Sequence, residues 1–123
     1  MNDDLADLAR ELRRLSNLLD RAVQALRVAG ADHANAEHGY RLARGVAWAE
    51  TAGQGLVVAE REALVDSVTA DKRRDRDLAA ALEKSALEAI RARRQQLSAL
   101  LSLMAGLREE TAFHRTGPGC DFP

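Results

Sequence analysis

The residues of this chain with the clearest chemical potential are cations that recur at helical spacing near its middle. They are Lys72, Arg73, Arg76, Lys84, Arg91 and Arg94. At about 100° per residue of an α-helix, the five from Arg73 to Arg94 fall within roughly 80° of each other, in a row about 30 Å long. Such a row can follow a phosphate backbone and release its counterions. The pattern also fits an ordinary solvated helix face, because Asp77, Glu83 and Glu88 flank the cations.

The charge and the aromatic content restrict what this row can bind. The net charge of the whole chain is −1, so the basic character is confined to one segment. Aromatic residues make up only 3% of the chain, which argues against extensive stacking on bases. Tyr40 and Trp48 have alanine neighbours at helical spacing and are interpreted as packing anchors. Nucleic-acid binding through this segment is therefore expected to be sensitive to salt and indifferent to base sequence.

Other kinds of chemistry find little support in the sequence. No local motif places a nucleophile beside a base, and Gly117-Pro-Gly119 lacks the lysine and the following helix of a phosphate loop. His33 and His38 are separated by about 140° around a helix, so they diverge. No zinc-binding spacing occurs either. The sequence predicts a protein that is not an enzyme and that needs neither a metal nor a cofactor.

The cysteine content and the termini indicate a location. Cys120 is the single cysteine, so no disulfide forms within the chain, as is usual in a reducing compartment. No apolar run approaches the roughly 20 residues that span a bilayer, and the first residues are acidic rather than basic. We expect a cytoplasmic protein with no membrane partner.

The elements that must position the cations are all helical. A first helix over residues 3–28 is expected to end at Gly30, and a second helix of small residues to cover 33–51. A break at Gly53–Gly55 precedes a long third helix over 57–113, which is either continuous or interrupted near residue 70 by a cap at Thr69–Asp71. Residues 116–123 read as a flexible tail.

Apolar positions on these helices predict self-association. The first helix carries a heptad seam, and the third carries an apolar face roughly opposite the cations. The candidate interface residues are Leu5, Leu8, Leu12, Leu15, Leu19, Leu26, Ile90, Leu97, Leu100 and Met104. Whether the first seam pairs within one subunit or between subunits is open. The expected fold is all-α: one domain over 1–115, an elongated hairpin or bundle of three or four helices that assembles into a helical homo-oligomer.

Several short motifs in this order resemble a known family. They are Tyr40-Arg41-x-Ala43-x-x-x-Ala47, a break containing glycine, Ala59-Glu60-Arg61-Glu62-Ala63, and a closing helix with Leu100-Leu101-Ser102 and Arg108-Glu109-Glu110. Across about residues 33–115 the chain resembles the small phage proteins of the UvsY recombination-mediator type.

The resemblance implies a ring-like helical oligomer in the cytoplasm of an infected bacterium. Such a protein binds single-stranded DNA, helps to displace single-strand-binding protein and loads a RecA-like recombinase. The family's basic segment follows its second helix, where this chain has Asp66 and no cation between Ala63 and Ala70; the nearest basic cluster starts at Lys72. The alternative is a phage assembly or scaffolding protein that self-associates through coiled coils without binding DNA.

Overall fold

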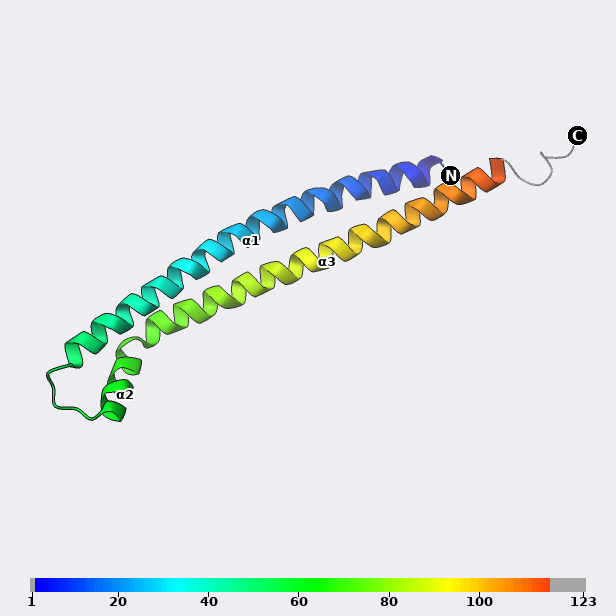
Figure 1. Ribbon diagram of the computed structural model, residues 1–123. Coiled ribbons are helices and arrows are strands. Elements are labelled where there is room, and N and C mark those ends of the chain that lie inside the picture. The colour runs from blue at the N-terminus through cyan, green and yellow to red at the C-terminus, as the bar shows by residue number, and fades with distance from the viewer. Residues whose placement is uncertain (1, 116–123) are drawn as a thin grey trace, which may run out of the picture. The chain divides into compact units, whose positions relative to one another are not determined.

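The computed structural model describes residues 2–115, and the regular elements in that range are three α-helices without strands, which confirms the all-α class (Figure 1). They are α1 (Asn2–Thr51), α2 (Val58–Val68) and α3 (Ala70–Arg115). The chain divides into two compact units. Unit 1 is formed by the described parts of residues 1–23 and 88–123, and unit 2 is Gln24–Leu87. None of the described helices is long and apolar enough to span a membrane.

Unit 1 is held together by leucine side chains. The first part of α1 lies beside the last part of α3, and Leu15, Leu100 and Met104 form a buried cluster between them. Leu8, Leu12, Leu18 and Leu97 pack against this cluster. Six of the residues that the sequence offers as an oligomer interface belong to this intrachain cluster: Leu8, Leu12, Leu15, Leu97, Leu100 and Met104.

Unit 2 has a core of smaller side chains. It brings the second part of α1 against α2 and the start of α3, and its buried residues are Ala47, Thr51, Val65 and Thr69. The break at residues 53–55 occurs as expected, and Gly55 there adopts φ +69°, a conformation that favours glycine. Few large aliphatic side chains are covered within this unit.

The interruption near residue 70 is present at Thr69. The Thr69 backbone N–H and hydroxyl both donate to the Val65 carbonyl, at 3.0 and 2.7 Å, and so close the last turn of α2. The Thr69 carbonyl then accepts a bond from the Arg73 N–H at 3.0 Å in the first turn of α3. The separate helices on either side of this residue agree with a cap at Thr69–Asp71. The expected tail at 116–123, with Cys120, lies outside the described residues.

The predicted end of the first helix at Gly30 is wrong. α1 runs without interruption through this position, so the helices expected at 3–28 and 33–51 are one. The reason lies in the heptads: the series that reaches Leu26 continues every seven residues through His33, Tyr40 and Ala47, all of them half-buried or buried. A pairing surface that keeps its register outweighs the cost of about 1 kcal/mol for one helical glycine.

Candidate nucleic-acid interface

The covered side chains of α3 repeat every seven residues. In unit 2 they include Arg76 and Glu83, and in unit 1 Ile90, Leu97 and Met104 continue the same spacing. A strict seven-residue repeat drifts by about 20° per heptad relative to a straight helix, which amounts to roughly 80° from Arg76 to Met104. A fixed angle of 100° per residue therefore assigns residues at the start of α3 to the wrong face.

One prediction for α3 is corrected by this drift. Arg76, assigned to the row of exposed cations, lies instead on the covered side, where its side chain is only 25% exposed.

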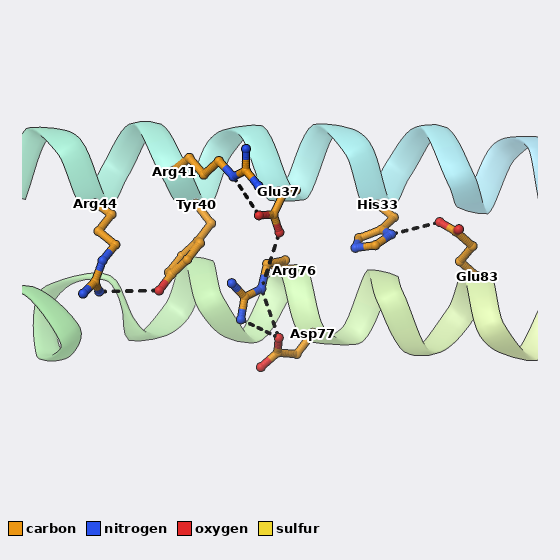
Figure 2. Close-up of polar contacts among 8 residues, drawn as sticks. All are labelled: His33, Glu37, Tyr40, Arg41, Arg44, Arg76, Asp77 and Glu83. Atoms are coloured by element: carbon orange, nitrogen blue, oxygen red, sulfur yellow. Dashed lines mark hydrogen bonds and ion pairs between the residues drawn. The ribbon is translucent and has the colours of Figure 1, made fainter.

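Arg76 is held by side chains of α1 and α3 in unit 2. Its guanidinium carbon lies 4.4 Å from the centroid of the Tyr40 ring, a cation–π contact. Its Nε and Nη2 donate to Oδ1 of Asp77 at 3.1 and 3.0 Å, and Nε lies 3.7 Å from Oε2 of Glu37 on α1 (Figure 2). The hydrogen bond to Asp77, above all, raises the pKa of Arg76. These contacts make Arg76 part of the helix pairing rather than a cation that is available to a ligand.

Two arginines of α1 close to this cluster are also paired. Arg41 Nε donates to Glu37 Oε1 at 2.9 Å, so Glu37 serves Arg41 and Arg76 together (Figure 2). Arg44 Nη1 donates to Asp66 Oδ1 at 2.6 Å, which joins α1 to α2 and raises the pKa of Arg44. This part of unit 2 is therefore rich in cations but largely neutralised.

The remaining five predicted cations are exposed. They are Lys72, Arg73 and Lys84 in unit 2 and Arg91 and Arg94 in unit 1. Within residues 2–115, none of these five side chains forms an ion pair or a side-chain hydrogen bond. Arg73 and Lys84 lie about three helical turns apart on one side of α3, and Arg91 and Arg94 are neighbours at i, i+3. These five side chains can therefore reach a polyanion without breaking an existing contact.

Trp48 has one ring face occupied by an arginine of α2. The Arg61 guanidinium carbon lies 4.5 Å from the centroid of the Trp48 ring. Arg61 Nε donates to the Thr51 hydroxyl at 2.8 Å, and its Nη2 donates to the Trp48 carbonyl. The tryptophan and Arg61 thus attach α2 to the end of α1, in keeping with a packing role. Sequence reasoning missed the contacts of Arg61 and Asp66. Their partners, Trp48 and Arg44, lie on α1, on the other side of the loop that precedes α2.

Titratable side chains do not gather into a metal centre in the described part of the chain. No group of three or more histidine, cysteine, aspartate or glutamate residues there has a geometry suited to a metal ion. His33 Nδ1 lies 2.9 Å from Glu83 Oε2, a single polar contact between α1 and α3 within unit 2 (Figure 2).

Among the described residues, the geometry thus offers exposed cations on the part of α3 that belongs to each unit. No protein-family model matches the chain, and no curated protein and no solved structure shows significant similarity to it.

Proposed function

We propose that this protein is a non-enzymatic, self-associating protein that binds single-stranded DNA and acts as a recombination mediator. In this role it helps a RecA-like recombinase to replace single-strand-binding protein on the strand, in the bacterial cytoplasm. The single observation that carries the DNA-binding part is that five of the predicted cations on α3 are exposed and have no ion-pair partner within residues 2–115. The mediator role itself rests on the resemblance of residues 33–115 to the UvsY-type proteins.

The physical argument is the contrast between two classes of cation. Arg41, Arg44 and Arg76 have carboxylate partners at 2.6–3.7 Å, and a phosphate would have to displace those partners. No carboxylate within residues 2–115 pairs with Arg73 or Arg91, so a phosphate near them gains the charge interaction and releases counterions without breaking a contact of the described fold. Because the contact involves charge and few rings, no base preference is expected.

The test is binding of fluorescent oligothymidine at about 50 mM salt, followed by fluorescence anisotropy as the salt concentration rises. The site variant carries Arg73→Glu, Arg91→Glu and Arg94→Glu. Its matched control carries Arg13→Glu, Arg21→Glu and Arg27→Glu, three exposed arginines of α1 with the same change in charge. We expect the site variant to lose at least tenfold in affinity, and the slope of log K against log salt to become less negative by about 2.

Two results would contradict DNA binding at this site. One is wild-type protein that does not retain DNA at about 50 mM salt. The other is equal loss in the site variant and the control, which would reduce the effect to net charge. If binding is found, the mediator role is tested by the DNA-dependent ATPase rate of a RecA-like recombinase on strands coated with single-strand-binding protein, which should rise when this protein is added.

The second candidate is an assembly or scaffolding protein that acts by self-association alone. The observation that favours it is the number of large aliphatic side chains left exposed in unit 2, among them Leu42 and Leu82. This function predicts a stable oligomer with no affinity for DNA, so the anisotropy measurement separates the two candidates.

A further inference from the structure

We propose that a second copy of this chain docks on one side of unit 2, named here the aliphatic face. Its large side chains are Val28, Leu42, Val46, Val68, Leu78 and Leu82, each of them at least half exposed. The inference rests on the self-association included in the proposed function, and it assigns that association to a surface that the sequence did not single out.

Residues of the aliphatic face share one side of the helix pair. On α1, Val28 and Leu42 are separated by two heptads, and Ala25, Asp32, Gly39 and Val46 form a second series with a spacing of seven. On α3, Leu78 and Leu82 are one turn apart. Two grooves connect these series: one includes Val28 and Leu82, and the other includes Leu42, Val46 and Val68. Five of the six side chains line these grooves, and Leu78 lies one turn from Leu82.

The aliphatic face is comparable to the largest apolar patch of a typical monomer, and such patches are often functional. Six half-exposed valine and leucine side chains leave on the order of 500 Å² of aliphatic surface in water, within the range of about 300–600 Å² for such patches. A stable interface buries roughly 800 Å² per partner, so these six side chains would supply the greater part of one.

The core of unit 2 explains why such a face needs a cover. Its pairing positions on α1 include Ala29, Ala36, Ala43 and Ala47, and small side chains remove little apolar area from water. The larger aliphatic side chains of this unit lie mainly outside that seam. A partner that covers them supplies the burial that the pairing of α1 with α3 does not.

The relief of the aliphatic face suits a copy of itself. The groove of 320 Å³ beside Val28 and Leu82 lies towards one end of the face, and the groove of 430 Å³ beside Leu42 and Val46 lies towards the other. A two-fold axis between the grooves brings the first groove of each copy against the second groove of its partner, the arrangement of an isologous dimer.

The charged residues that line the grooves are compatible with the same two-fold axis. Asp32 lines the first groove, and Lys72 lines the second beside Glu50. The two-fold axis turns the first groove of one copy towards the second groove of the other, so the Asp32 side meets the Lys72 side twice. In the dimer, Lys72 belongs to this contact, and Arg73 and Lys84 are the predicted cations of unit 2 that remain available to DNA.

The first experiment measures the mass of the purified full-length chain, 13.4 kDa per copy, by sedimentation equilibrium. We expect wild type to sediment as a dimer or a multiple of it, and Leu42→Glu with Leu82→Glu to sediment as a folded monomer with unchanged helical circular dichroism. The control is Leu101→Glu, which introduces the same charge at an exposed leucine of unit 1 and should leave the mass unchanged. A wild-type monomer, or a double variant that keeps its mass while folded, overturns the proposal.

The second experiment tests the axis itself by cysteine cross-linking in a Cys120→Ser background. Asn35 is exposed on α1, seven residues from both Val28 and Leu42, so Asn35→Cys should form a disulfide with its own copy on mild oxidation. The control His38→Cys is three residues away and exposed. Equal cross-linking of both cysteines overturns the assigned face. If wild-type protein dimerises but does not bind DNA, the proposed function is contradicted and the proposed interface is not.

Discussion

The continuity of α1 through Gly30 leads to a prediction in which the sign of one substitution decides the matter. If Gly30 ended a helix in a left-handed conformation, Gly30→Ala would destabilise the protein, because a β-carbon is strained there. In the structure, Gly30 is helical, and an added β-carbon would meet as its nearest neighbour Glu83 Oε2 at 3.9 Å, an ordinary contact. The substitution should therefore stabilise the protein.

The magnitude follows from helix propensity. An alanine in place of a glycine inside a helix gains about 0.5–1 kcal/mol. For a chain of this size, that gain raises the melting temperature by roughly 3–5 °C. Gly45→Ala is the matched control, since Gly45 is exposed within α1 with nothing within 4 Å of an added β-carbon. Gly55→Ala should have the opposite sign and cost about 1–2 kcal/mol, because Gly55 has φ +69°.

Urea unfolding followed by circular dichroism at 222 nm gives all three free-energy differences, provided that the m-value stays constant. The refuting result is a destabilised Gly30→Ala beside a stabilised Gly45→Ala. That pair of signs would restore the helix end at Gly30 that the sequence suggests. It would also remove the basis for a heptad seam that continues past Leu26.

Two further predictions concern the cations of α3 and the leucine core of unit 1. Arg76→Ala should lower the melting temperature, because the contact with the Tyr40 ring is lost, and should leave the salt dependence of DNA binding unchanged. Arg73→Ala should do the reverse, with the salt slope less negative by about 0.7; the same response in both variants would contradict the distinction. In unit 1, Leu15→Ala should cost about 2–4 kcal/mol in urea unfolding, since this side chain is 5% exposed. Leu101→Ala, half exposed, should cost less than about 1 kcal/mol, and similar values for both would show that the leucine core is not formed.

The sequence was sufficient for the helices where apolar side chains of ordinary size mark the seam. Leu5, Leu12 and Leu19 make the heptads of α1 visible, and the glycines at 53 and 55 mark the loop. The same repeat continues through His33, Tyr40 and Ala47. Because these three residue types differ in hydropathy, they do not stand out in the sequence as one apolar series. Gly30 therefore suggested the end of a helix, because the continued seven-residue repeat becomes evident only once the pairing partner of α1 is known.

The candidate site was predictable in part for a related reason. Arg73, Lys84, Arg91 and Arg94 are exposed on α3 as the sequence suggests, since a charged residue that lacks a partner stays in water. Arg76 was misplaced because a straight-helix projection ignores the drift of a seven-residue repeat. Its partners Glu37 and Tyr40 lie on another helix, more than 30 residues away in the sequence.

The two units differ in the sequence distance that their pairing must close, and this has a consequence for the order of folding. In unit 2, Arg44 meets Asp66 across 22 residues, and His33 meets Glu83 across 50. In unit 1, Leu15 packs with Leu100 about 85 residues along the chain, where the entropy of loop closure is greatest. During synthesis, the leucine-rich start of α1 leaves the ribosome long before its partner exists. Until residues 88–115 emerge, that segment is the part of the chain most exposed to chaperones or to a neighbouring nascent copy.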